Sequence, residues 1–371
     1  MEYMTGELSD GTTPYSAFKE NEGKVVSIKG AIHNIRDMSD FAFIILRTAR
    51  ELIQCVYSPE FSDYRLKENV VEQASAKITG KIVKSQTRDG SERFEIQIHD
   101  IEILSVPAAI PPVVINKKQV NCDLNIDLDF RPVTLRNPKE RAVFKIQEGI
   151  QRGFREHLSN CGFTEIHTPK INFAGAEGGT NVFKLDYFGK TVFLAQSPQL
   201  YKQALVPVYE RVFEIGPVFR AEHHDTSRHL NEYISMDFEM GFIDSFTDIM
   251  EMETGVLKYI MELLKREYAP EVELLKVDIP EIDKIPCIRF KDAKELCVKK
   301  LKNITDMKDF EPEEEAFLGK WAKQQYGSDF LFVTHYLSKK RPFYTMDDPE
   351  DPEVTLSFDL LFRGIEITSG G

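Results

Sequence analysis

An unusual polar face on a strand pair is the feature that most constrains the fold of this chain. In residues 233–241, Tyr, Ser, Asp and Glu alternate with Ile, Met and Phe. Because successive side chains of a strand point to opposite sides, this alternation predicts a strand whose apolar face packs against a core. The other face carries Tyr233 beside two acids, Asp237 and Glu239, where an ordinary half-buried strand would expose Lys, Thr or Ser.

Residues 211–222 predict the partner strand of an antiparallel pair. The end of this segment carries Arg220 and Glu222 on a shared face. The loop that follows is rich in basic and imidazole side chains: His223, His224, Arg228 and His229. A face that gathers Arg, Glu, Tyr and Asp suits a flat, anionic, amine-bearing ligand. We therefore expect a nucleotide and an amino acid to bind to this strand pair.

The composition is ordinary for a globular protein with room for two domains. The chain has 371 residues, of which 42% are apolar and 29% charged. The acidic start and the lack of any stretch near the roughly 20 apolar residues of a membrane helix predict a cytoplasmic protein without a membrane segment. Five scattered cysteines without a CxxC pair argue against a zinc site or a disulfide framework. The net charge of -13 argues against indiscriminate polyanion binding, although a local basic or aromatic surface can still read a structured RNA.

The N-terminal part predicts a small β-barrel. Five short runs rich in Val, Ile and Phe lie within residues 24–105, with Gly, Asp and Ser between them. A closed barrel of the oligonucleotide-binding (OB) type is one common solution for such runs. OB folds read single strands with aromatic and polar side chains on one sheet face, and Phe43 and Gln54 are candidates. Composition alone favours Phe43 as a core residue.

A proline-containing segment then separates the barrel, residues 1–105, from the rest of the chain. We expect residues 106–137 to form a hinge or linker. Asn137 can cap the helix that follows, and Pro138 suits its first turn. Apolar residues recur at helical spacing up to Gly162, a plausible C-terminal cap. Both a core helix and a dimer-interface helix fit this pattern.

Residues 138–371 predict an α+β domain in which strands and helices follow in mixed order. The sequence contains neither GxGxxG nor GxxxxGK[ST], which excludes the Rossmann fingerprint and the P-loop. A glycine-rich loop at 175–180 carries Glu177. A helix that starts near Gln199 places Gln199, Lys202 and Gln203 on one face. Such a lysine is usually solvated, but its neighbours favour a functional role. The charge-rich segment 271–321 is predicted to be a peripheral insertion.

Together these segments resemble the class II aminoacyl-tRNA synthetases, most closely the aspartate–tRNA ligases of the archaeal type. Residues 217–240 are similar to the second signature motif, and residues 162–171 to the end of the first, which builds the dimer interface. Residues 175–180 resemble the mobile loop over the amino-acid site, and QSPQLYKQ at 196–203 resembles the hallmark of the subgroup. Residues 358–371 resemble the acidic strand before the third motif. The resemblance implies an antiparallel class II sheet flanked by helices, lacking its last strand and helix.

The resemblance implies an ATP site on the predicted strand pair. Arg220 would hold the α-phosphate, where charge builds up as a carboxylate attacks it. Glu222 would read the adenine amino group or order the loop, and Tyr233 would stack on adenine. His229 would lie near the terminal phosphates. The implied ATP-binding residues are Arg220, which is also the catalytic residue, Glu222, Arg228, His229, Leu230, Tyr233 and Glu366.

An amino-acid pocket is implied beside the ATP site. Asp237, Gln199 and Glu177 would hold the α-ammonium group of L-aspartate, and Lys202 would pair with the side-chain carboxylate. An asparagine substrate would leave that buried ammonium unpaired, at a cost of several kcal/mol. The implied aspartate-binding residues are Glu177, Ser197, Gln199, Lys202, Asp237 and Ser369.

The resemblance also implies a magnesium ion and a two-step reaction. Glu366, and with it Ser369, would bind Mg²⁺ that bridges the phosphates, because Mg²⁺ prefers hard oxygen ligands. The aspartate carboxylate would attack the α-phosphorus of ATP, and the 3′-hydroxyl of the tRNA would then take the aspartyl group. Positioning and charge stabilisation would carry the rate, without a covalent enzyme intermediate.

The implied partners are tRNA(Asp) and a second copy of the chain, which would pair through the first-motif helix. Phe43, Gln54 and Glu95 match the anticodon readers of the family, which favours Phe43 as a reader. His33 lies where members restricted to one tRNA often carry Trp, which hints at tRNA(Asn) as an additional substrate. The implied anticodon-binding residues are His33, Phe43, Gln54 and Glu95.

The printed sequence ends at Gly371, where members of the family continue into a third motif that grips ATP. We therefore expect this chain alone to be weakly active or inactive, as for a fragmentary gene product. Three classes of function stay open: a ligase for aspartate or asparagine, a non-catalytic tRNA-binding relative, and an amidotransfer-type relative that makes free asparagine. The predicted barrel argues against the last, since such an enzyme needs no anticodon reader.

Overall fold

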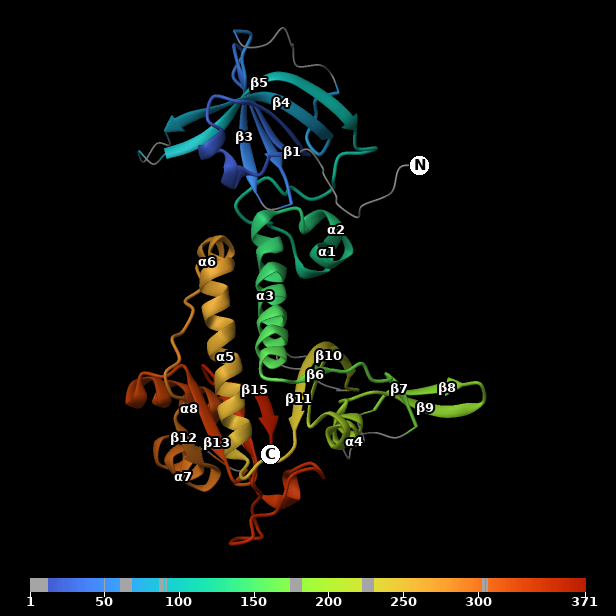
Figure 1. Cartoon of the computed structure of the whole chain (residues 1–371), viewed down its shortest axis with the longest axis vertical. Helices are drawn as coiled ribbons and strands as arrows, with labels where there is room; N and C mark the ends of the chain where they lie inside the picture. Colours follow the sequence, from blue (N-terminus) through green and yellow to red (C-terminus); the bar gives the residue numbers. More distant parts are fainter. Residues whose placement is uncertain are drawn as a thin grey trace. The chain divides into compact units, whose positions relative to one another are not determined.

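The structure, a computed structural model, forms two compact units, Met1–Arg141 and Ala142–Gly371. It describes residues 13–49, 51–60, 69–86, 90, 92–173, 182–221, 230–301, 304 and 306–371. Figure 1 colours the first unit from blue to blue-green and the second from green to red.

The first unit contains a closed five-stranded barrel, which confirms the OB-type fold predicted from the sequence. Its strand order is β1-β2-β3-β5-β4, with β3 and β5 parallel and the other pairs antiparallel. The residues that fill the barrel are mainly alternate Ile, Leu and Ala side chains of the strands, as expected for strands with one buried face. The strands are β1 (Val25–Asp37), β2 (Ala42–Arg47), β3 (Leu52–Tyr57), β4 (Ser75–Gln86) and β5 (Glu92–Ser105), preceded by the short helices η1 (Tyr15–Ala17) and η2 (Lys19–Asn21).

Helical structure follows the barrel. The segment 106–137, predicted as a hinge, contains the short helices α1 (Leu124–Asp129) and α2 (Arg131–Thr134). Asn137 is fully buried, and its side-chain amide donates to two carbonyl oxygens of the preceding chain at 2.8 and 2.9 Å. Its Oδ1 accepts from the backbone N–H of Lys139 at 2.9 Å, as expected for the residue that caps α3 (Pro138–Asn160). The boundary between the two units falls inside α3.

In the second unit, α3 packs closely against α5 (Thr247–Glu267), and Figure 1 shows the two helices side by side. A Cβ atom on Gly153 of α3 would lie 2.9 Å from the side chain of Ile260 and 3.2 Å from its Cα. Glycine therefore allows the close approach of the two helices, and a larger residue would force them apart.

The described residues of the second unit form three sheets. The first has the order β11-β10-β6, the second β7-β9-β8 and the third β12-β13-β14-β15. The strands are β6 (Thr164–Glu165), β7 (Ile171–Asn172), β8 (Lys184–Tyr187), β9 (Lys190–Leu194), β10 (Arg211–Phe219), β11 (Glu232–Met240), β12 (Cys287–Arg289), β13 (Phe330–Thr334), β14 (Phe358–Phe362) and β15 (Ile365–Gly370). The remaining helices are α4 (Gln199–Tyr209), α6 (Ala269–Leu275), α7 (Phe290–Lys300), α8 (Pro312–Tyr326) and η3 (Ser338–Lys340).

The central strands of the third sheet, β13 and β14, are buried on both faces. Residues of α7 and α8 pack against one face, and Met250 of α5 packs against the other. The segment 271–321, predicted as a peripheral insertion, thus supplies β12 to this sheet and α7 and α8 to its cover. Within the part of the chain that the structure describes, no helix is long and apolar enough to cross a membrane.

Candidate functional site

β10 and β11 form the predicted antiparallel pair, in regular register along their whole length. The apolar face of β11 is only partly covered. Phe238 and Met240 pack against the core that α3 and α5 build, whereas Ile234 and Met236 keep 45% and 36% of their surface exposed. The half of β11 near its loop is therefore not held by core packing on its apolar side.

The polar face of β11 meets the first turn of α4 in a cluster of four side chains, Gln199, Lys202, Asp237 and Glu239. The two residues from α4 are three positions apart, so they share one helix face. Both are 5% exposed. The hydroxyl of Ser197 accepts from the backbone N–H of Gln199 at 3.1 Å and so supports the start of the helix.

Lys202 lies between two carboxylates without a close bond to either. Its Nζ is 3.3 Å from Oδ1 of Asp237 and 3.5 Å from Oε2 of Glu239. Ammonium–carboxylate hydrogen bonds are commonly about 2.7–2.9 Å long. The Gln199 amide donates to Glu239 at a closer 2.9 Å. A third contact of the Lys202 ammonium group, with the backbone oxygen of Phe238, is 3.4 Å long, so all three contacts are longer than this range.

Glu239 is a member of this cluster that the sequence analysis did not assign to a site. The available signal was its spacing, because it is two residues from Asp237 and so lies on the same face of β11. Glu214 was also missed. It pairs with Asp237 across the two strands, is 3% exposed, and accepts from the backbone and hydroxyl of Thr168 at 2.8 Å each. Lys170 contacts it at 2.9 Å, which ties the segment of the predicted first motif to the polar face.

Arg220 and Tyr233 come together at the loop end of the strand pair. The Arg220 guanidinium carbon lies 5.8 Å from the centre of the Tyr233 ring, within cation–π range. The backbone N–H of Arg220 donates to Asn231 O at 3.0 Å, so the pairing of the two strands continues into the start of the loop. Leu230 is 61% exposed beside it.

A bulge in β15 places Glu366 and Ser369 on one face of the third sheet. In a regular strand, residues three apart point to opposite sides. The register of β15 against β14 shifts at Ile367, which is an extra residue there. Glu366 and Ser369 therefore point to the same side, which they share with Asp359, the residue paired with Ser369.

The carboxylates on this face perturb one another. Burial raises the pKa of Asp359, which Arg341 partly offsets by an ion pair at 2.5 Å. The pKa of Glu366 is raised to about 8, first by loss of hydration and then by the neighbouring charges of Asp359 and Glu315, although its side chain keeps an exposed surface.

A cation would relieve this repulsion, and the oxygen donors of Glu366 and Ser369 fit the hard ligand preference of Mg²⁺. The described residues contain no cluster of three or more His, Cys, Asp or Glu side chains that could hold a metal ion. Any Mg²⁺ here would therefore take its other ligands from phosphate or water.

Three of the predicted anticodon readers share the outer face of the barrel. Phe43 lies on β2 at a half-buried position outside the barrel core, and its ring packs edge-on against Phe41 at 5.2 Å. Gln54 of β3 donates to Glu95 of β5 at 2.8 Å. The structure thus brings Gln54 and Glu95 into contact and leaves the Phe43 ring partly open to solvent.

His33 differs from the other three, because it is only 3% exposed. The register of β1 against β2 shifts between Ile32 and Asn34, so His33 is an extra residue in the strand. Its Nδ1 lies 3.1 Å from Nη1 of Arg47. Burial, Arg47 and Arg141 lower the pKa of His33 to about 4, so the imidazole is neutral near pH 7. In this position His33 touches a solvent-facing ligand only through Arg47.

Four predicted site residues lie outside the described residues: Glu177, Glu222, Arg228 and His229.

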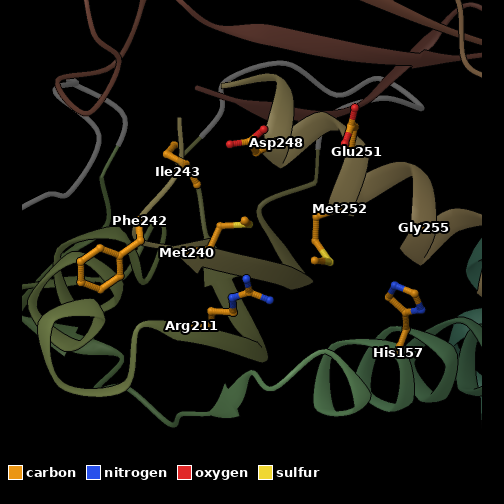
Figure 2. A pocket seen from close by; sticks show the side chains of 9 residues that line it. All are labelled: His157, Arg211, Met240, Phe242, Ile243, Asp248, Glu251, Met252 and Gly255. Atoms are coloured by element: carbon orange, nitrogen blue, oxygen red, sulfur yellow. The ribbon is translucent and has the colours of Figure 1, made fainter. Parts of the chain in front are cut away.

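An open hollow of about 390 Å³ lies away from all the predicted site residues. Figure 2 shows its lining, with His157 of α3 and Arg211 of β10 facing Asp248 and Glu251 of α5. The hollow lies at the end of β10 and β11 opposite to their loop. The polar cluster around Lys202 is therefore a contact surface on the strand pair and not part of this hollow.

Comparison with known proteins agrees with this arrangement. Residues 123–371 match the family of tRNA synthetases class II (D, K and N). The chain belongs to the class II tRNA synthetases. Residues 26–104 of this synthetase match the OB-fold nucleic acid binding domain. The combination of barrel and class II domain predicted from the sequence is thereby confirmed, and membership in the family implies the use of ATP.

Curated relatives of this synthetase share its sequence along most of its length. The aspartate–tRNA(Asp/Asn) ligase of Deinococcus radiodurans is 45% identical over 358 residues, which are 95% of this chain and 80% of the relative. The aspartate–tRNA(Asp) ligase of Pyrococcus abyssi is 36% identical and covers 95% of this chain and 81% of the relative. The predicted resemblance to aspartate–tRNA ligases is confirmed. The chain spans about four-fifths of these relatives.

The fold also matches solved synthetase structures. Asparaginyl-tRNA synthetase from Pyrococcus horikoshii, complexed with asparaginyl-adenylate, superposes with a TM-score of 0.82 at 25% identity and covers 94% of this chain and 79% of that one. Because an asparagine enzyme has the same fold, the backbone alone does not select between aspartate and asparagine.

Proposed function

We propose that this synthetase is an aspartate–tRNA ligase, which activates L-aspartate with ATP and transfers it to the 3′ end of tRNA(Asp). The observation that carries the proposal is the buried ammonium group of Lys202, with contacts of 3.3 and 3.5 Å to Asp237 and Glu239. A carboxylate of the substrate would give this ammonium group a charged acceptor at normal distance, whereas the carboxamide of asparagine brings no charge. Hydrogen bonds to a charged acceptor are roughly twice as strong as those between neutral groups, which favours aspartate.

The names of the relatives support aspartate as the amino-acid substrate and favour a second tRNA acceptor. The relative that is 45% identical is named for tRNA(Asp/Asn), and the one that is 36% identical for tRNA(Asp) alone. We therefore include tRNA(Asn) as a second acceptor. Phe43, Gln54 and Glu95, on the outer face of the barrel, would read the anticodon by stacking and hydrogen bonding. His33 would act on the tRNA through Arg47.

The polar face of β11 would hold the amino acid. Asp237 would bind the α-ammonium group together with Gln199, while Lys202 binds the side-chain carboxylate. Glu239 would accept from Gln199 and keep its amide oriented. Ser197 and Ser369 would line the same pocket, and Glu177 would close over it. The α-carboxylate of aspartate is then left unpaired and can act as the nucleophile.

Arg220 and Tyr233 would hold ATP at the loop end of the same pair. Tyr233 would stack on adenine, and Arg220 would stabilise the charge that develops on the α-phosphate. The aspartate oxygen forms a bond to the α-phosphorus as pyrophosphate leaves. The 3′-hydroxyl of the tRNA then attacks the aspartyl carbonyl, and AMP leaves. The remaining ATP contacts would come from Leu230 and, outside the described residues, from Glu222, Arg228 and His229.

Glu366 and Ser369 would hold Mg²⁺, which when bound neutralises phosphate charge. The bulge at Ile367 supports this proposal, because it turns both side chains to one face. The carboxylate of Asp359 on the same face adds negative charge that attracts the cation.

We further propose that the synthetase is a cytoplasmic homodimer that pairs through α3. Val143 and Phe144 of this helix expose 52% and 44% of their surface, which favours a further partner for that helix face. The cysteines of the described chain are free thiols, as is usual for proteins of a reducing compartment.

The test is substrate selection by Lys202. We expect the chain to bind the sulfamoyl analogue of aspartyl-adenylate in calorimetry more tightly than the asparaginyl analogue. Aspartate-dependent ATP–pyrophosphate exchange provides a catalytic readout of the same choice. Lys202→Glu should abolish the preference, and the exposed Lys323→Glu on α8 is the matched control. Equal binding of both analogues by the unmodified chain, or an unchanged preference in Lys202→Glu, would contradict the proposal.

A further inference from the structure

Arginine side chains converge at one edge of the barrel face. Arg47 ends β2, Arg136 follows α2, and Arg141 lies in the first turn of α3. Burial, with the nearby positive charges of Arg136 and Arg141, lowers the pKa of Arg47 to about 10. All three belong to the first unit.

The two arginines at the centre of this cluster are held by neutral groups. Nη2 of Arg47 and Nη1 of Arg136 donate to the same oxygen, Oε1 of Gln73, at 3.2 and 3.3 Å. Nη1 of Arg47 contacts the neutral ring of His33 at 3.1 Å. Among the residues that the structure describes, no carboxylate lies within ion-pair distance of Arg47 or Arg136.

Gln73 supports the two arginines from a strained backbone. Its φ is 71°, in the left-handed region that residues with a side chain rarely adopt. Its N–H donates to Ile32 O at 2.6 Å, next to the bulge at His33. Strained residues of this kind tend to persist where a site requires them. Here the strain places a neutral acceptor between two cations.

The cluster continues the face that carries Phe43. Along β2, the half-buried positions are Phe43, Ile45 and Arg47, and they alternate with fully buried residues. Arg47 lies four positions after Phe43 along the strand, which is about 13 Å at 3.3 Å per residue. OB folds bind roughly 4–16 nucleotides. A strand of RNA with a base stacked on Phe43 is therefore long enough to reach Arg47.

We propose that Arg47 and Arg136 form a binding site for a backbone phosphate of the RNA strand whose bases meet Phe43, with Gln73 and His33 as positioning residues. The planar forks of two guanidinium groups suit the oxygens of one phosphodiester, and an anion between them removes their mutual repulsion. This inference rests on the proposed function in taking RNA as the partner of the barrel, and it explains how an acidic protein can bind RNA at a local basic site.

The test is the salt dependence of RNA binding by the full chain. The probe is a fluorescein-labelled RNA hairpin with an unpaired loop, titrated by anisotropy at several salt concentrations. Each phosphate contact with single-stranded RNA contributes about 0.7 to the slope of log K against log salt. We expect Arg136→Gln and Arg47→Gln each to lower the slope by about 0.7 and to weaken binding of all loop sequences alike.

Lys77→Gln is the matched control, because it removes one positive charge from the same barrel at an exposed pair with Glu102. It should leave the slope unchanged. A second arm uses hairpins in which single loop linkages are neutral methylphosphonates. One such linkage should weaken binding to the unmodified chain but not to Arg136→Gln. Thermal melting checks that each variant is folded. If Arg47→Gln is unfolded, the salt dependence of Arg136→Gln alone tests the phosphate site.

The outcomes separate the two proposals. Absence of RNA binding, or a slope in Arg136→Gln equal to that of the control, overturns the phosphate site. Competition by millimolar inorganic phosphate without any effect of the methylphosphonates would assign the site to a free anion and also overturn it. Failure of the proposed function appears elsewhere, as loss of preference for the aspartyl-adenylate analogue in a chain that still binds RNA.

Discussion

Replacing Glu253 by glutamine should stabilise the second unit at high pH. Glu253 lies on α5, is 5% exposed, and its Oε2 accepts no hydrogen bond within the described residues. Burial raises its pKa from 4.5 to about 7, Thr368 offsets part of this by a hydrogen bond, and Asp359 adds repulsion. The folded state therefore prefers the protonated acid.

The sign and size of the effect follow from this pKa. A carboxyl group whose folded pKa is raised contributes full stability below its unfolded pKa of 4.5 and loses it as the pH rises through 7. At 1.36 kcal/mol per pKa unit, a change from 4.5 to about 7 corresponds to about 3 kcal/mol, most of it lost between about pH 5 and pH 8. Glutamine has no charge to bury, so Glu253→Gln should gain most of this amount at pH 8 and little at pH 5.

Urea unfolding at the two pH values measures the effect. Trp321 on α8 is the only tryptophan of the chain, so its fluorescence reports the second unit alone. Glu262→Gln, at an exposed position of the same helix, is the matched control. It should leave the free energy of unfolding unchanged at both pH values. If the difference in unfolding free energy between Glu253→Gln and the unmodified chain is the same at both pH values, the raised pKa assigned to Glu253 in the folded state is incorrect.

Three further predictions test other parts of the structure. Lys294 and Glu314 form a buried ion pair at 2.7 Å, so Lys294→Met should cost about 3–5 kcal/mol by urea unfolding, and adding Glu314→Gln should restore much of the loss. His33, with its pKa lowered to about 4, contributes stability above pH 6.5 that is lost as the pH falls toward 4. His33→Asn should remove about 3 kcal/mol of that dependence, seen as a flatter thermal melting profile over this range. Phe43→Ala should weaken RNA binding by about 1–3 kcal/mol without a change in melting temperature, whereas Phe188→Ala, exposed on the second unit, should not affect binding.

Much of the fold could be predicted from local patterns. The alternation in residues 233–241 predicts a strand, and β11 occupies Glu232–Met240. Five short apolar runs predict the five strands of the barrel. The polar residues of β11 were candidates for a site because two acids and a tyrosine on one face have no role in a core. Periodicity of this kind is a property of neighbouring residues, so a strand or helix reveals it before any tertiary contact forms.

The partners of those side chains came only from the tertiary structure. Glu239 joins the cluster because α4 brings Gln199 and Lys202 against β11. Glu253 looks like any acid on an amphipathic helix, and only the packing of α5 against the third sheet buries it.

By itself, the sequence determined where strands and helices form and which faces carry unusual chemistry, because these follow from spacing along the chain. The tertiary structure alone decided the direction of the side chains at the two bulges. Regular alternation would place Glu366 and Ser369 on opposite faces, and it would turn Ile35 of β1 away from the barrel core that Ile32 faces. The shifted pairing of β15 with β14 brings Glu366 and Ser369 to one face, and the shifted pairing of β1 with β2 makes His33 the extra residue of its strand. The physical reason is that a bulge is set by the register with a partner strand, which no single strand encodes.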